Sequence, residues 1–174
     1  MDKSLTGVER FFSPDELIVT KTDLKGRITY ANSVFLRMSS LTLSEAIGAP
    51  HSIIRHPAMP RVVFKVLWDE IQAGNEIFAY VLNRATNGDH YWVLAHVTPS
   101  LGEGGSQIGY HSNRRVPDRN VIANTIQPFY AKLLAEEARH GGGREGITAA
   151  ATVLTDFLSS KGASYEDFIF SLDN

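Results

Sequence analysis

The chain has 174 residues, of which 43% are hydrophobic, so it can enclose one core and a small appendage but hardly two full domains. Its formal net charge is -2 and it has no basic run, which disfavours nucleic acid and acidic membranes as partners. It has no cysteine, which excludes disulfides, thiolate metal sites and cysteine nucleophiles.

The sequence also lacks the signals of membrane insertion and export. No apolar run approaches the roughly 20 residues that cross a bilayer. The polar start, MDKSLTGVER, lacks the charge, apolar run and small residues of a signal peptide. We therefore expect a cytoplasmic protein that does not insert into the membrane.

The first part of the chain predicts a β-hairpin followed by two short helices. Residues rich in β-branched side chains flank the turn signals of Asp23 to Gly26. Asn32 is suited to cap a helix, and Thr42-Leu43-Ser44-Glu45 fits a capping box that ends at Gly48. The expected order is an arm at 1–16, strands at 17–22 and 27–30, and helices at 32–38 and 42–48.

The stretch from Pro50 to Trp68, PHSIIRHPAMPRVVFKVLW, organises the chain. Pro57 and Pro60 prevent one continuous helix, because each removes a backbone donor and favours extended geometry before it. We expect a turn that presents Arg55 and His56. From Pro60 the apolar residues recur at helical spacing until Gly74, which places Phe64 and Trp68 on one stripe of a helix.

The later part of the chain predicts three more strands and a helical tail. The Asn87-Gly88 pair favours the tight turn of an antiparallel hairpin. After Pro117, Asp118 can cap an amphipathic helix, and the triple glycine at 141–143 separates it from later helices. The expected elements are strands at 77–84, 90–99 and 107–113, then helices at 118–140, 147–159 and 165–172.

This order of elements predicts an α+β fold, in which small helices lie on one face of a five-stranded antiparallel sheet. We expect a helical extension after a boundary near Val116. The predicted domains are an N-terminal arm at 1–16, an α+β domain at 17–116 and a C-terminal helical extension at 117–174.

From about Leu17 to Arg115 the chain resembles a PAS sensor domain, and within that class the flavin-binding PAS domain of bacterial aerotaxis receptors. The two most specific motifs are RHPxMP, from Arg55 to Pro60, and NGDHYWV, from Asn87 to Val93. The other matching segments are Thr22-Asp23-Leu24, Ile28-Thr29-Tyr30-Ala31-Asn32, Pro50-His51, Trp68 and Asn83-Arg84.

The resemblance implies that the domain binds FAD noncovalently between its sheet and helices, and passes a redox-dependent change of shape to a signalling partner. It implies aerotaxis or energy-taxis signalling, in which oxygen or redox state is sensed for chemotaxis. The residues implied to bind the cofactor are Asn32, Arg55, His56, Phe64, Trp68, Asn83, His90 and Trp92, and no metal site is implied.

The chemistry of these residue types suits a flavin dinucleotide. A guanidinium such as that of Arg55 can hold a pyrophosphate, and an imidazole such as that of His56 offers a nearby donor. Trp68 has a broad face for stacking, and the amides of Asn32 and Asn83 can donate and accept along the polar edge of a flavin. The ring would supply the electron chemistry.

The chain departs from the aerotaxis receptors at two points. Ala58 stands where the family commonly has an acidic residue after RHP, which removes a polar contact and puts the adenine end of the site in doubt. The receptors also continue into a membrane anchor and a signalling module, whereas we expect this chain to be a free-standing sensor that needs a separate output protein.

Each of these residues also has a structural interpretation. Taken alone, Trp68 is a core residue of an amphipathic helix, and Asn32 is a helix cap. Asn83 is the opposite case, because an amide in a strand needs a partner, which favours ligand contact. Alternation puts Trp92 and Tyr91 on opposite faces of the sheet, and the pattern does not fix which face lines the pocket.

Three alternatives remain open. The six histidines permit a PAS gas sensor that binds haem through one of them, whereas a closed metal site lacks ligands at suitable spacing. A cofactor-free PAS interaction module would use the apolar tail helix for its partner. No glycine loop or catalytic constellation supports an enzyme. We expect a downstream signalling partner, and a homodimer formed through the sheet or the helical extension.

Overall fold

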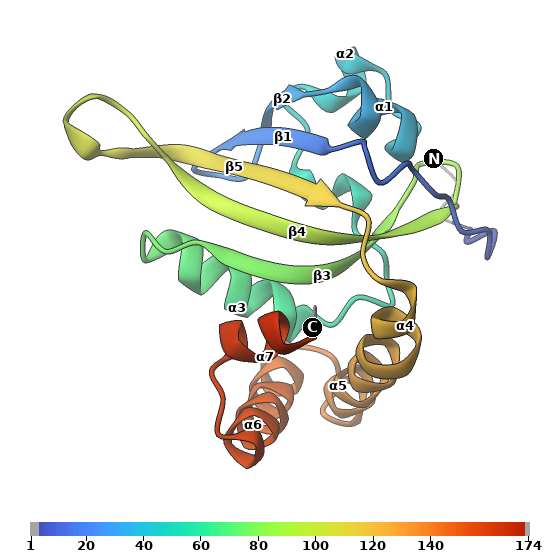
Figure 1. Cartoon of the computed structure of the whole chain (residues 1–174), viewed down its shortest axis with the longest axis vertical. Coiled ribbons are helices and arrows are strands. Elements are labelled where there is room, and N and C mark those ends of the chain that lie inside the picture. The colour runs from blue at the N-terminus through green and yellow to red at the C-terminus, as the bar shows by residue number, and fades with distance from the viewer. Residues whose placement is uncertain (1–3, 173–174) are drawn as a thin grey trace. The chain divides into compact units, whose positions relative to one another are not determined.

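The computed structural model describes residues 4–172 and confirms the predicted α+β class. Five strands form one antiparallel sheet in the order β2-β1-β5-β4-β3, so β5 is central and β2 and β3 are the edges (Figure 1). The strands are β1 Ile18–Asp23, β2 Ile28–Ala31, β3 Ile77–Arg84, β4 His90–Leu101 and β5 Gln107–Arg115.

The helices follow the predicted order, with one irregularity in the tail. They are α1 Ser33–Ser39, α2 Leu43–Ala46, the 3-10 turn His51–Ile54, α3 Arg61–Gln72, the 3-10 turn Glu103–Gly105, α4 Arg119–Val121, the π-helical turn Ile122–Ile126, α5 Gln127–Arg139, α6 Arg144–Lys161 and α7 Tyr165–Ser171.

The predicted caps are confirmed. The Asn32 side chain accepts a hydrogen bond from the Phe35 backbone and starts α1. The capping box of Thr42 and Glu45 starts α2, and Asp118 accepts from two backbone N–H groups at the start of α4. These contacts satisfy donors that a helix leaves unpaired at its first turn, which is why the sequence signal was strong.

The tail helix differs from the prediction of one continuous α-helix. Between α4 and α5 lies a π-helical turn, in which the Gln127 N–H donates to the Ile122 carbonyl. Pro128 follows and has no N–H to donate to Asn124, so the wider turn accommodates an interruption that the proline imposes. Ile122, Ile126 and Leu133 are nevertheless buried, as their spacing predicts.

The chain packs as two units. The first contains residues 4–56 and Glu70–Val116, and its core includes Ile18, Phe35 and Val93. The second contains Pro57–Asp69, where α3 begins, and residues 117–172, with a core around Leu133 and Ala150. These are units of packing, and the predicted domain bounds of 1–16, 17–116 and 117–174 stay predictions. Residues 1–3 of the arm and 173–174 of the extension lie outside the described residues.

Residues 4–10 lie along the turn that joins β3 and β4. The backbone of Thr6 donates to the Gly88 carbonyl, and His90 exchanges backbone hydrogen bonds with Val8 and Arg10. Gly88 has φ 97°, and a Cβ atom there would overlap the Ser4 carbonyl oxygen, so the turn requires glycine for both reasons. Residues 4–10 are thus joined to the first unit by backbone hydrogen bonds.

Candidate functional site

Arg55 and Asn83 lie on one side of the sheet, next to its β3 edge. Arg55 forms an isolated antiparallel bridge with Asn83, and Asn83 lies opposite Tyr91 in the β3–β4 ladder. Residues opposite each other in a ladder point to the same side of the sheet. We name the side that carries Asn83 and Tyr91 the inner face.

Two buried polar groups on the inner face have no hydrogen-bond partner among residues 4–172. The Asn83 side chain is 3% exposed and its Nδ2 is unpaired, and the fully buried Tyr91 has an unpaired hydroxyl. Buried amides and hydroxyls are normally hydrogen-bonded, because losing water without a replacement costs about 1–3 kcal/mol. Their neighbourhood is therefore suited to a polar group brought by a ligand or an ordered water.

The inner face continues onto β5 through Arg114. Arg114 lies opposite Ala95 of β4 and Ile18 of β1, in register with the face of Tyr91. One guanidinium nitrogen, Nη2, donates to Thr20 Oγ1 at 3.0 Å and to His51 Nε2 at 2.6 Å. The other, Nη1, is buried without a partner in the described part of the chain. Arg114 thus has donor capacity left on this face.

The groups around Arg114 are held neutral. Burial, and then the Arg114 charge, lower the pKa of His51 to about 3, so its ring accepts from Arg114 as a neutral imidazole. Burial raises the pKa of Tyr91 well above its usual range. Burial also lowers the pKa of Arg114 to about 10, which still leaves the guanidinium charged at neutral pH. The inner face thus carries one net positive charge in this cluster.

His56, His90 and Trp92 lie on the other side of the strands. The rings of His56 and His90 are 5.8 Å apart. Burial, followed by the charges of His90 and Arg84, lowers the pKa of His56 to about 4. Trp92 is 4% exposed and follows Tyr91, so alternation places it on the face opposite Asn83. The structure therefore divides the predicted site residues into two groups.

Asn32 performs the structural task that competed with a ligand role. Its Oδ1 accepts from the Phe35 and Val19 backbones, and its Nδ2 donates to the Leu17 carbonyl at 2.8 Å. These three bonds join α1 to β1 and leave one N–H of the amide for any further contact.

Phe64 and Trp68 lie one turn apart on α3, and both are half-buried. Their position in the second unit is consistent with the predicted aromatic stripe of an amphipathic helix. Their role in binding a cofactor stays a prediction.

Sequence reasoning missed Arg114, His51 and Tyr91 as members of the inner-face cluster. Tyr91 belongs to the NGDHYWV motif, but only the pairing with Asn83 shows which face it shares. Arg114 stands next to Arg115 in β5, and two adjacent strand residues must point to opposite faces. That pair was a usable signal, because one of two such arginines in a central strand has to point inward.

Asp89 stabilises the β3–β4 turn that the Asn87-Gly88 pair predicted. Its carboxylate accepts from Thr6, Asn87 and Arg10, with Arg10 Nε at 3.0 Å. The hydrogen bonds from Thr6 and Asn87 are the main reasons that its pKa is lowered. Arg10 also donates to the Arg37 and Met38 carbonyls, so it ties the arm to the end of α1.

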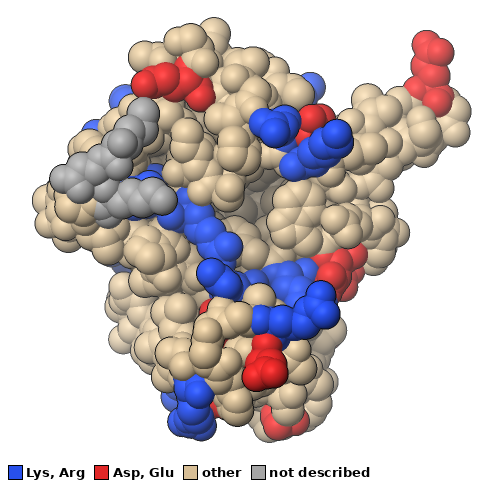
Figure 2. Space-filling model, turned by 180° about the vertical axis from the view of Figure 1, so that it is seen from behind, with Lys and Arg blue, Asp and Glu red and all other residues tan. Residues whose placement is uncertain are grey.

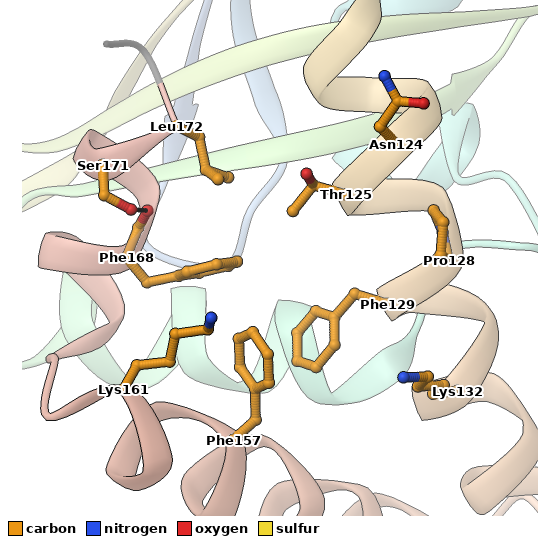
Figure 3. Close-up of a pocket in the computed structure, with 10 residues that line it drawn as sticks. All are labelled: Asn124, Thr125, Pro128, Phe129, Lys132, Phe157, Lys161, Phe168, Ser171 and Leu172. Carbon is orange, nitrogen blue, oxygen red and sulfur yellow. Dashed lines mark hydrogen bonds between the residues drawn. The ribbon is translucent and has the colours of Figure 1, made fainter.

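The second unit contains a separate hollow of about 380 Å³ (Figure 3). Three aromatic rings form its floor: Phe129 and Phe157 are 4.4 Å apart between centroids, and Phe157 and Phe168 are 5.1 Å apart. Lys161 lies over the Phe157 ring at 5.6 Å. The remaining lining residues are Asn124, Thr125, Pro128, Lys132, Ser171 and Leu172, so the lining has two cations and no carboxylate.

Residues 4–172 lack a metal-binding cluster and a membrane-spanning helix. No group of three or more His, Cys, Asp or Glu side chains in that range is arranged to hold a metal ion. No helix in it is long and apolar enough to cross a membrane. On the face shown in Figure 2, basic side chains form several groups with acidic ones between them.

Sequence comparison relates the chain to sensory and regulatory proteins. Residues 18–111 match the family model described as PAS fold. Over 122 residues, 70% of this chain, the sequence is 40% identical to the aerotaxis receptor of Escherichia coli (strain K12), of which the match covers 24%. It is 25% identical over 97 residues, 56% of this chain, to 20% of a nitrogen fixation regulatory protein of Klebsiella pneumoniae. The chain thus spans about a quarter or less of these relatives.

Solved structures show the same fold at low sequence identity. A light-oxygen-voltage domain studied with a flavin analogue covers 67% of this chain and 87% of its own, with 14% identity and a TM-score of 0.57. The blue-light activated histidine kinase EL346 of Erythrobacter litoralis covers 71% of this chain and 40% of its own, with 14% identity and a TM-score of 0.56.

Proposed function

The chain belongs to the PAS-fold family, and on that premise we propose that it is a sensor domain that binds FAD noncovalently and signals cellular redox or oxygen state to a partner protein. The observation that carries the proposal is the buried Asn83 amide, whose Nδ2 has no partner beside the unpaired Tyr91 hydroxyl. The relatives named as an aerotaxis receptor and as a domain studied with a flavin analogue support this choice of ligand.

The inner face fits the polar edge of a flavin. The Asn83 amide can donate and accept, and the backbone of Arg55 is bridged to that of Asn83, so we propose that the Arg55 guanidinium contacts the pyrophosphate of the same ligand. Of the other predicted contacts, Asn32, Phe64 and Trp68 stay in the proposal. His56, His90 and Trp92 lie on the face opposite Asn83 and would not meet the same edge of the ring. Bound FAD would supply electron transfer, and we propose that the chain itself performs no catalysis.

Binding is proposed to be noncovalent because the chain has no cysteine. A thiol adduct to the ring is therefore impossible here, and the proposed stimulus is a change in redox state. In that case Asn83 must serve both ligand states, which an amide can do by turning over to exchange its donor and acceptor.

We propose that the tail helices carry the output. A change at Asn83 would shift the sheet, and the segment Asp118–Leu134 would respond. Hydrogen exchange of the FAD-loaded protein should then differ between oxidised and reduced samples at Asp118–Leu134. Equal protection in both states would contradict this step and would leave FAD binding intact.

The absorption spectrum of the purified protein, after reconstitution with FAD, tests the cofactor proposal. Two broad bands in the blue and near ultraviolet that bleach on chemical reduction are expected, whereas haem would give an intense Soret band. Asn83→Leu should bind FAD at least tenfold more weakly, because it removes the amide from a buried position. Asn87→Ala, at the exposed turn, is the matched control and should bind normally.

A second candidate function is a PAS interaction module without a cofactor, and the hollow of the second unit favours it. A surface with three packed phenylalanine rings and two lysines is suited to an apolar segment with acidic flanks. If the reconstituted protein stays colourless, this function becomes the better account. Light scattering of wild type and Phe157→Glu would then show whether the partner is a second copy of the chain.

A further inference from the structure

The inner face of the sheet holds a positive charge that no carboxylate offsets. Arg114 is 4% exposed, and its hydrogen bonds go to Thr20 and His51, both of which are neutral. The Phe35 ring, 6.0 Å from the guanidinium carbon, offers a weak cation–π contact. Within residues 4–172, Arg114 forms no ion pair.

The surroundings of Arg114 lack two things that a buried cation needs. Removing a charge from water is costly unless a counter-charge and a full set of hydrogen bonds replace the water. Arg114 lacks the first, and its buried Nη1 lacks a partner for the second. The structure thus assigns a place for negative charge at Arg114, to be filled by something that is not part of the described chain.

The position of Arg114 in the sheet indicates which part of FAD would supply the negative charge. Arg114 is in β5, the central strand, and is almost fully buried, whereas Arg55 is half-buried beside the edge strand β3. A pyrophosphate is strongly hydrated and suits the more exposed Arg55. The flavin ring is apolar apart from one edge and suits the interior near Phe35 and Tyr91.

We propose that Arg114 is a positioning residue that holds the negative charge acquired by the flavin ring on reduction, and that it thereby raises the reduction potential of the sensor. The inference rests on the proposed function. In the step concerned, a one-electron donor is oxidised and the ring gains one electron. Without an accompanying proton the ring gains one unit of negative charge, which the Arg114 guanidinium offsets.

The groups that face Arg114 favour charge compensation over proton transfer. His51 Nε2 accepts a hydrogen bond from Arg114, so this nitrogen carries no proton and the ring keeps its one proton on Nδ1. Tyr91 retains its proton because burial raises its pKa. Thr20 and Phe35 do not titrate in this range. The charge on the ring is thus stabilised by Arg114 without a proton donor among these neighbours.

The test compares FAD-loaded wild type with Arg114→Gln and Arg114→Lys by spectroelectrochemistry between pH 6.5 and pH 8.5. Arg114→Gln should lower the equilibrium constant for the first electron at least tenfold, which corresponds to about 59 mV for one electron. The equilibrium constant of Arg114→Lys should lie between those of wild type and Arg114→Gln. In wild type the reduction potential for the first electron should not depend on pH. In Arg114→Gln this potential should fall as the pH rises, because a proton is taken up together with the electron.

Arg115→Gln is the matched control, because Arg115 is the exposed neighbour on the opposite face of β5 and should leave the potential unchanged. If Arg114→Gln binds FAD too weakly for electrochemistry, its affinities for oxidised and reduced FAD are titrated separately. By linkage the reduced form should be weakened at least tenfold more than the oxidised form.

Equal weakening of both forms, or an unchanged potential with an unchanged pH slope, would overturn the role of Arg114 and leave FAD binding standing. Failure of the wild-type chain to bind FAD in either state would instead remove the proposed function, and this inference with it. The two failures are therefore read from different samples.

Discussion

Arg114 in the sheet and Glu137 in the tail helices are both almost fully buried charged residues, and their surroundings differ. Glu137 is 5% exposed, and its carboxylate accepts from the Val62 N–H at 2.9 Å, in the first turn of α3. A helix N-terminus suits an anion because its first N–H groups have no partner within the helix. Arg114 has neutral partners and an unpaired Nη1.

This difference is the one expected between a structural charge and a charge that we propose is reserved for a ligand. Around Glu137 the chain also closes on itself, since the Gly142 N–H donates to the Glu137 carbonyl and Arg61 donates to the Gly142 carbonyl. A charge that only stabilises the fold is expected to be paired in this way. The inner face leaves Asn83, Tyr91, Ser112 and Arg114 with unpaired atoms.

The largest expected effect concerns the packing around Glu137. A Cβ atom on Gly146 of α6 would overlap the Glu137 carbonyl oxygen of α5. Gly146→Val should therefore lower the free energy of unfolding by about 3 kcal/mol, because two helices must separate. Urea denaturation measures it. Gly143→Ala, where a Cβ would meet nothing within 4 Å, should cost less than about 1 kcal/mol. Equal costs would contradict the tight packing.

The next effect tests whether the Glu137 carboxylate is structural. Glu137→Leu should lower the free energy of unfolding by about 2 kcal/mol, because it leaves the buried Val62 N–H without an acceptor. Glu136→Gln is the control on the same helix, where the carboxylate pairs with Arg139 and His140 at the surface. It should cost no more than about 1 kcal/mol. If Glu137→Leu leaves the free energy of unfolding unchanged, the carboxylate is not needed for stability.

Local signals in the sequence predicted the elements well, because the deciding interactions are short-range. Asn32, Thr42 and Asp118 cap the helices that follow them, and the Asn87-Gly88 turn joins β3 to β4. The exception was the tail, where the effect of Pro128 on the helix geometry was not read from the spacing of apolar residues.

The site was less predictable, because it depends on pairings between distant segments. Alternation separated Tyr91 from Trp92 but did not show which of them shares a face with Asn83. The β3–β4 register settles that point, and the bridge of Arg55 to Asn83 adds a residue that lies 28 positions earlier. His51 and Arg114, which lie 63 positions apart, meet only in the folded sheet.

Arg114→Met is expected to act in the opposite direction from Glu137→Leu. In flavin-free protein it should raise the free energy of unfolding by about 1–2 kcal/mol, because it replaces an unpaired buried charge with an apolar side chain of similar length. Arg115→Met, at the exposed neighbouring position, should change it by less than about 0.5 kcal/mol. A loss of stability in Arg114→Met would indicate that Thr20 and His51 suffice as its partners.

The smallest expected effect is a pH dependence that belongs to the sheet unit. The folded-state pKa values of His51 and His56, about 3 and 4, lie below the ordinary value of 6.5, so below pH 6.5 the unfolded chain binds more protons than the folded one. The contribution of these histidines to stability should thus be fully present above pH 6.5 and decrease as the pH is lowered, by about 1 kcal/mol per histidine between pH 7 and pH 5.5.

Urea denaturation of flavin-free wild type and His56→Gln at both pH values measures this pH dependence. The variant should lose about 1 kcal/mol less than wild type on acidification, because its side chain at position 56 cannot take up the proton that the unfolded wild type binds. An identical loss would place the acid sensitivity elsewhere than in the cluster of His56, His90 and Arg84.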